Sequence, residues 1–299
     1  MREIARHLKR AASSISREIA RGGGIKSYRS VPADERAWWR ARRPKRCLLV
    51  HHEQLRRVVS AKLLIDWSPQ QISGWLSQAY PDDESMRVSH ETIYRSLFIQ
   101  ARGALKRELT QHLRRGRTQR RARLTAPRAP TIVDAVSIRQ RPAEVEDRAV
   151  PGHWEGDLLC GASASLVERK SRFVMLVKAP SKDTQLLVGA LRKHVRKLPS
   201  QLRASLTWDR GTEMAGHKLL TLATQMKVYF CDPHSPWQRG SNENTNGLLR
   251  QYFPKGTDVS TFSQQQLDEV AMRLNQRPRK TLNFSTPAHV FAQSVAGTG

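Results

Sequence analysis

The chain contains 299 residues, with 52 Lys and Arg against 26 Asp and Glu, which leaves a formal net charge of +26 at pH 7. This length allows two or three domains and argues against a single small module, and such a charge favours a polyanionic partner, above all nucleic acid. No apolar run approaches the roughly 18 residues of a membrane-spanning helix and no basic-then-apolar leader opens the chain, so we expect a cytoplasmic protein with no membrane partner.

The first predicted domain, residues 1–46, begins with two short helices in a helix-turn-helix pattern. Ser13 or Ser14 is predicted to cap the second helix, whose Ile15 and Ile19 would pack inward. In such a unit the second helix enters the major groove of DNA. An ordinary pair of amphipathic helices would give the same pattern. The candidate DNA contacts on the second helix are Ser14, Ser16 and Arg17.

A second helix-turn-helix unit is predicted within residues 47–101. Ser68 and Pro69 form a good N-cap and first-turn pair, and Ser89 can cap the helix that follows. That helix would bury its apolar stripe and turn its polar side toward DNA. Its candidate DNA contacts are Thr92, Tyr94 and Arg95.

Residues 102–150 form a basic linker by composition, with many arginines, including Arg114 and Arg115, and little apolar periodicity. A charged linker of this kind can be a solvated spacer. Because the charges are almost all positive, we favour a segment that follows DNA phosphates.

A mixed α/β domain is predicted from residue 151 to residue 299, where short apolar runs alternate with helical stretches. Such an order indicates a five-stranded sheet with flanking helices and helices at the C-terminus. The strands are expected at 154–160, 165–168, 172–178, 204–208 and 227–231, and the helices at 183–197, 216–226 and from about 240.

Three acidic residues of this domain are candidates for catalysis. Asp157 lies inside an apolar strand, where an ionised carboxylate is costly unless a metal or a partner holds it. Asp209 follows a strand and Glu243 opens a helix, both common places for sites in α/β domains. Each also has a structural explanation: a buried ion pair for Asp157, a turn for Asp209 and the helix dipole for Glu243.

Two further residues accompany these acids. Arg250 lies two helical turns after Glu243 and could hold DNA beside it, or could be an ordinary solvated arginine. Glu155 shares the strand face of Asp157 and is a candidate for a supporting role. The three cysteines form no C-x-x-C pair, so neither a disulfide framework nor a zinc knuckle is predicted.

Three segments carry a resemblance to a known family: GHWEGDLL at 152–159, TWDRGTE at 207–213 and SPWQRGSNENTNGLLRQYFPKGTD at 235–258. Together they resemble the insertion-sequence-thirty family of bacterial transposases, which belongs to the wider group with a retroviral-integrase-like ribonuclease H fold and an Asp, Asp, Glu triad. The spacing of 33 residues between Asp209 and Glu243 is also the family's own. The resemblance spans nearly the whole chain.

The resemblance implies that Asp157, Asp209 and Glu243 coordinate divalent metal, and their hard oxygen donors suit Mg²⁺ or Mn²⁺. Two such ions could drive in-line attack on phosphorus during DNA cleavage and strand transfer. The implied partners are double-stranded DNA, both terminal inverted repeats and target DNA, and further copies of the chain on paired ends. The implied location is the bacterial cytoplasm, in association with the nucleoid.

Two other functions fit part of the pattern. A DNA-binding remnant or regulator is suggested because the chain begins almost inside the first helical unit, where Lys9 occupies a turn position that favours glycine. A left-handed Lys9 would cost on the order of 1 kcal/mol, so we expect residues 1–60 alone to bind DNA weakly and mainly non-specifically. A nuclease acting on RNA–DNA hybrids would share the metal chemistry but would not need two DNA-reading units.

Overall fold

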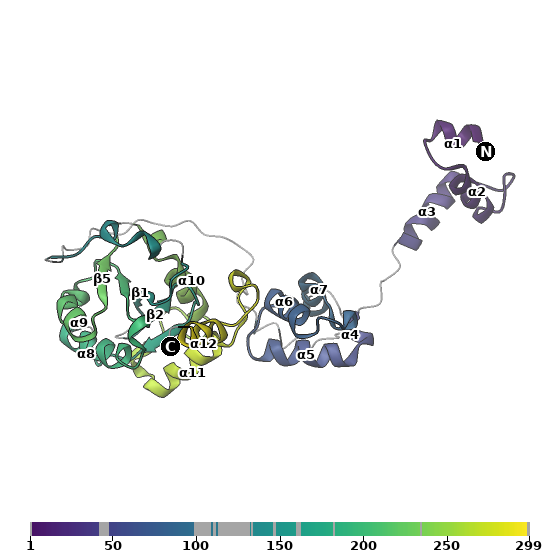
Figure 1. Ribbon diagram of the computed structural model, residues 1–299. Coiled ribbons are helices and arrows are strands. Elements are labelled where there is room, and N and C mark those ends of the chain that lie inside the picture. The colour runs from purple at the N-terminus through teal and green to yellow at the C-terminus, as the bar shows by residue number, and fades with distance from the viewer. Residues whose placement is uncertain are drawn as a thin grey trace. The chain divides into compact units, whose positions relative to one another are not determined.

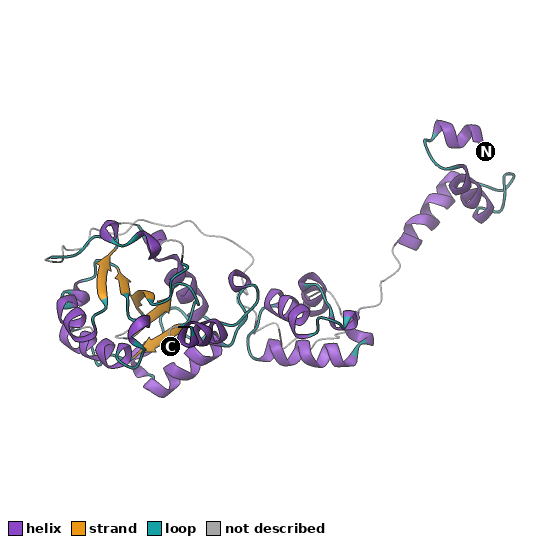
Figure 2. Cartoon of the chain, viewed as in Figure 1, coloured by secondary structure: helices purple, strands orange, loops and turns teal. Residues whose placement is uncertain are grey.

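The computed structural model describes residues 2–41, 48–98, 109, 112, 132, 134–145, 148–159, 163–181, 183–233 and 235–297. The chain divides into two compact units, Met1–Cys47 and Leu48–Gly299, which we take in turn (Figures 1 and 2). None of the described helices has the length and apolar character needed to cross a membrane. The predicted contacts Arg114 and Arg115 lie outside the described residues.

The first unit is entirely helical, with α1 at Arg2–His7, α2 at Ala12–Arg21 and α3 at Ser30–Ala41. Its small core consists of Ala5, Ile15 and Ile19, against which Tyr28 packs. Lys9, between α1 and α2, has a φ of 50°, so the left-handed turn expected from the sequence is present without glycine.

The predicted cap of α2 is wrong, because the helix begins at Ala12 and Ala11 is its N-cap without a side-chain hydrogen bond. The amide of Ser14 donates to the carbonyl of Ala11, so the serines lie inside the first turn. A backbone turn therefore starts this helix where we had expected a hydroxyl cap.

The second unit begins with four helices: α4 at Leu48–His51, α5 at Glu53–Leu64, α6 at Pro69–Ala79 and α7 at His90–Phe98. Ser68 caps α6 in a full capping box with Gln71, as its sequence predicted. The hydroxyl of Ser89 accepts from the amide of Thr92 and so caps α7. The fully buried side chains that hold these helices together are Leu55, Val59, Leu63, Ile72, Leu76 and Ile93.

The rest of this unit is built on a mixed five-stranded sheet in the order β3-β2-β1-β4-β5. Its strands are β1 at His153–Leu158, β2 at Ala164–Glu168, β3 at Val174–Val177, β4 at Ser205–Trp208 and β5 at Lys227–Phe230. The first three are antiparallel, whereas β4 lies parallel to both β1 and β5. The predicted architecture, a mixed five-stranded sheet with helices, is therefore confirmed.

Helices pack on both faces of this sheet (Figure 2). Neighbouring residues of a strand point to opposite faces, and Leu166 and Val167 of β2 accordingly belong to two different apolar clusters. The first cluster includes α8 at Thr184–Val195 and α9 at His217–Thr224. The second cluster includes α10 at Gly240–Leu249 and α11 at Gln264–Asn275. The last helix, α12 at Pro287–Ala296, packs its Phe291 on the first cluster.

Candidate active site

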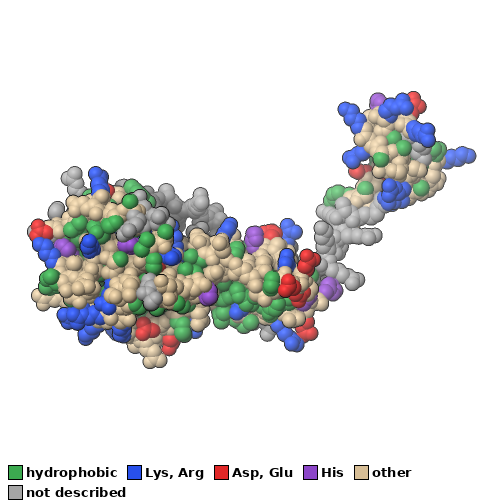
Figure 3. All heavy atoms as spheres, in the orientation of Figure 1, with side chains coloured by type: hydrophobic (Ala, Val, Ile, Leu, Met, Phe, Trp, Pro, Cys, Tyr) green, Lys and Arg blue, Asp and Glu red, His purple; other side chains and the backbone are tan. Residues whose placement is uncertain are grey.

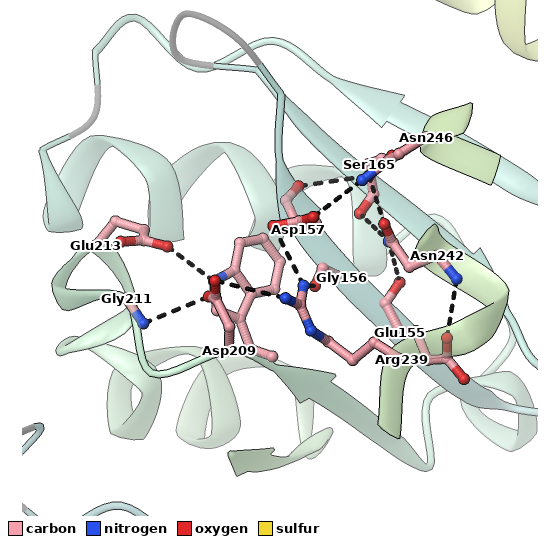
Figure 4. Close-up of polar contacts among 11 residues, drawn as sticks. Glu155, Gly156, Asp157, Ser165, Asp209, Gly211, Glu213, Arg239, Asn242 and Asn246 are labelled. Carbon is pink, nitrogen blue, oxygen red and sulfur yellow. Dashed lines mark hydrogen bonds and ion pairs between the residues drawn. The ribbon is translucent and has the colours of Figure 1, made fainter. Parts of the chain in front are cut away.

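Two of the three candidate acids come together at one end of the sheet. Asp157 is near the end of β1, and Asp209 directly follows β4, which pairs with β1 in parallel register. Because parallel strands bring their carboxyl ends to the same edge, residues far apart in sequence meet there. Figure 4 shows both carboxylates directed toward the guanidinium of Arg239.

Arg239 bridges the two aspartates. Its Nη1 lies 3.2 Å from Oδ1 of Asp157 and donates to the carbonyl oxygen of Gly156 at 2.8 Å, while its Nη2 lies 3.5 Å from Oδ2 of Asp209. The side chain of Arg239 is only 11% exposed. The guanidinium therefore serves as the counter-ion of both carboxylates in the protein alone.

The environment raises the pKa values of both Asp157 and Arg239. Burial raises the pKa of the Asp157 carboxyl, against the lowering effect of Arg239, and the neighbouring charge of Asp209 raises it further. Burial alone would lower the pKa of Arg239, but the two carboxylates outweigh it and raise that pKa above its ordinary value. The guanidinium thus stays charged, and removing it would leave two carboxylates in mutual repulsion.

An amide network attaches α10 to β1, which carries Asp157, and to the neighbouring strand β2. Asn246 donates to Oδ2 of Asp157 at 2.9 Å, and the hydroxyl of Ser165 on β2 donates to Oδ1 of Asn246 at 3.0 Å. The buried amide of Asn242 donates to the carbonyl oxygens of both Glu155 and Ser165, at 3.0 and 3.2 Å. These contacts fix one face of α10 against β1 and β2 (Figure 4).

Glu155 contributes to the same attachment from the sheet. Its side chain is 1% exposed, and its Oε2 accepts the backbone amide of Asn242 at 2.9 Å. The guanidinium of Arg169 lies 3.5 Å from its other oxygen and supplies a compensating charge. Glu155 therefore holds the first turn of α10 and does not face Asp209.

Glu243, the third candidate acid, is exposed on the first turn of α10. Within the described part of the chain, no three His, Cys, Asp or Glu side chains form a group that could hold a metal ion. The structure thus joins Asp157 and Asp209 through Arg239 but does not bring Glu243 to them. Glu243 follows Arg239, the N-cap residue of α10, by four residues.

A hollow of about 360 Å³ elsewhere on the core lies between β3 and α11, whereas a smaller one of about 260 Å³ opens beside Asp157. Asn246, Arg250 and Lys255 are among the residues that line the smaller hollow with Asp157. Arg250 is exposed at the C-cap of α10. The positive side chains there stand next to the first aspartate, where they could meet a DNA phosphate.

The other predicted DNA contacts lie on helix surfaces. Ser14, Ser16 and Arg17 are all exposed on α2, on the side away from its buried isoleucines. On α7, Arg95 is exposed and paired with Glu91, while Thr92 and Tyr94 are half-buried. Figure 3 shows Lys and Arg side chains on the visible surface of each unit.

Sequence reasoning did not single out Arg239, Asn242 or Asn246. A signal was present, because these residues and Glu243 follow the i, i+3, i+4, i+7 spacing of one helix face. The face is polar, whereas a search for buried stripes looks for apolar residues. A polar stripe that contains a candidate catalytic acid is the pattern that would have found them.

Comparison with known proteins gives a consistent result. A family model described as an integrase core domain matches residues 147–236, a range that includes Asp157 and Asp209. The chain is 47% identical over its whole length to the transposase InsI for insertion sequence element IS30A of Escherichia coli K12, covering 80% of that protein. Over 99% of its length it is 48% identical to the transposase for IS1086 of Cupriavidus metallidurans, covering 90% of it. It is 34% identical to the transposase for IS4351 of Bacteroides fragilis, with 95% of this chain and 87% of the relative covered.

Proposed function

The chain belongs to the IS30 family of insertion-sequence transposases, and from this premise we propose that it cleaves and joins DNA strands by metal-dependent chemistry at Asp157, Asp209 and Glu243. The observation that carries the proposal is the pair of aspartates at the ends of neighbouring parallel strands, which jointly hold a cation, the guanidinium of Arg239.

This donor set suits a hard divalent cation. The acidic side chains offer only oxygen, which Mg²⁺ and Mn²⁺ prefer, and the space between Asp157 and Asp209 already accommodates a positive group. When bound there, one or two such ions would polarise the scissile phosphate and activate the attacking oxygen. Asn246 orients the Asp157 carboxylate through its 2.9 Å hydrogen bond, and we propose that Glu243 joins the aspartates in the DNA-bound protein.

We propose that DNA is held by both helical parts of the chain and by the basic segment before the core. The proposed organisation is a first helix-turn-helix unit at 1–46, a second at 47–101, a linker at 102–150 and the catalytic domain at 151–299. The expected partners are the terminal inverted repeats and target DNA, bound by a homo-oligomer in the cytoplasm, at the nucleoid. The proposed DNA contacts are Ser14, Ser16, Arg17, Thr92, Tyr94, Arg95, Arg114, Arg115 and Arg250.

The test is cleavage and strand transfer on a labelled duplex that carries the element's terminal repeat, with Mg²⁺ or Mn²⁺. Asp157→Asn, Asp209→Asn and Glu243→Gln should each abolish the products while leaving DNA binding intact. Glu269→Gln on α11, an exposed acid far along the chain from the site, is the matched control and should retain activity. A triad variant that keeps wild-type activity would exclude its residue from the site.

One observation favours a second candidate function, a DNA-binding regulator without catalysis. The described residues contain no assembled group of three acids at the site. A regulator needs only to bind DNA, so wild-type protein that binds the terminal repeat but yields no products with either metal would support it.

A further inference from the structure

Arg239 has a position that neither the family relationship nor the triad explains. Its guanidinium contacts Asp157, Asp209 and the carbonyl of Gly156 at once. Magnesium requires near-octahedral oxygen ligation at about 2.0–2.1 Å. A guanidinium and a metal ion therefore cannot use Oδ1 of Asp157 and Oδ2 of Asp209 at the same time, and they compete for these two oxygens.

The surroundings of Arg239 allow its side chain to leave. It ends the short helical turn Pro236–Arg239 with φ −120° and ψ 40°, outside the helix that starts at Gly240. An added Cβ at Gly240 would meet nothing within 4 Å, so there is open space beside the residue that follows Arg239. The Nε of Arg239 has no hydrogen-bond partner among the described residues. The ion pairs and the hydrogen bond that the described residues give this side chain all involve its two terminal nitrogens.

A displaced guanidinium would remain at the site, where DNA must come. The hollow beside Asp157 already presents Arg250 and Lys255, so the local surface is suited to phosphate. Arginine binds phosphate through two parallel hydrogen bonds, a geometry that its planar fork favours. Phosphate is therefore the group in this reaction that could take Arg239 from the aspartates.

Resting on the proposed metal site, we propose that Arg239 is a phosphate-binding residue of the active site which the two aspartates retain in the DNA-free protein. Metal binding releases it, and DNA phosphate captures it. Metal and DNA therefore bind with positive coupling, because each removes the competitor of the other. The free protein would hold metal weakly, and a metal-loaded site would form mainly on DNA.

The first test is a titration of the full chain with Mn²⁺ in the absence of DNA. The EPR signal of free Mn²⁺ reports how much of the ion is bound. Arg239→Gln should bind Mn²⁺ at least about fivefold more tightly than the wild type, within the usual range of coupling between sites. Arg239→Lys, which keeps the charge but loses the fork, should fall between them. Adding Asp157→Asn to Arg239→Gln should remove the gain.

A charge-matched control separates competition from a general change in electrostatic potential. Arg210 adjoins Asp209 in sequence, but its Nε donates to the carbonyl of Cys231 and its guanidinium forms neither of the two aspartate ion pairs. Arg210→Gln removes the same charge and should change Mn²⁺ affinity much less than Arg239→Gln. Equal gains in the two variants would overturn the proposal, as would equal affinity in wild type and a folded Arg239→Gln protein.

The second test repeats the titration with the protein saturated by a short duplex of mixed sequence. A control titration uses the Asp157→Asn/Asp209→Asn protein with the same duplex. It measures the Mn²⁺ that the DNA itself binds, and this amount is subtracted. Wild-type protein should gain Mn²⁺ affinity on DNA, and Arg239→Gln should gain little. Equal gains on DNA would overturn the capture by phosphate. Absence of Mn²⁺ binding in every protein, with or without DNA, would instead overturn the proposed metal site and this inference with it.

Discussion

Replacing Asn242 by alanine should destabilise the catalytic domain strongly, because this side chain is fully buried between α10 and the sheet. Its Nδ2 donates to the carbonyl oxygens of Glu155 and Ser165 at 3.0 and 3.2 Å, and its Oδ1 lies 3.3 Å from the hydroxyl of Ser165, whose single proton it shares with Asn246. Each full hydrogen bond contributes about 1 kcal/mol net and the shared one contributes less, so losing all three contacts should cost about 2–3 kcal/mol of unfolding free energy.

The assay is urea unfolding followed by tryptophan fluorescence, since Trp154 and Trp208 lie in the core of the same domain at 1% and 0% exposure. Asn244→Ala, an exposed position on the same helix, is the matched control and should change stability by less than about 0.5 kcal/mol. A difference between the two variants below about 1 kcal/mol would show that the network does not fasten α10 to the sheet.

Three further predictions concern other parts of the chain. Burial raises the pKa of the Cys231 thiol to about 11, so in a chain whose other two cysteines are serine it should resist iodoacetamide at pH 8 until the protein unfolds; fast labelling of folded protein would contradict this. The fold favours the neutral thiol over the thiolate, and this preference contributes to the free energy of unfolding. The contribution is complete below the ordinary pKa of the thiol and is lost as the pH rises through about 11, which urea unfolding at several alkaline pH values would detect. Gly156→Ala should destabilise the core by about 1–3 kcal/mol through overpacking, because an added Cβ would lie 2.2 Å from the ring of Trp208; unchanged urea unfolding would mean that the ring moves freely. Lys9→Gly should stabilise the first unit by up to about 1 kcal/mol, because the φ of Lys9 is 50°, a value that glycine adopts without strain. The control Arg17→Gly, inside α2, should destabilise the unit by a similar amount. Amide hydrogen exchange of that unit would measure both effects, and a loss of protection in Lys9→Gly would refute the strain at Lys9.

Local features of the chain were predictable where a few neighbouring residues determine them. Ser68 and Ser89 accept backbone amides three residues ahead, and these caps were evident from the sequence. The five strands also follow from short apolar runs, because each must bury its side chains in the sheet. The start of α2 was predicted wrongly, since a backbone turn at Ala11 replaced the expected serine cap.

The sequence by itself determined the mixed sheet and identified Asp157 as an acid inside a strand and Asp209 as an acid that follows one, because strand periodicity and turns are encoded by residues close together. The tertiary structure alone decided that Arg239 lies between these acids, that Asn246 orients one of them and that Glu243 stays apart from both. The contacts of Arg239 and Asn246 with β1 join residues more than 80 positions apart. They depend on how the polar face of α10 packs against β1 and β2, which is a property of the whole domain and of no single segment.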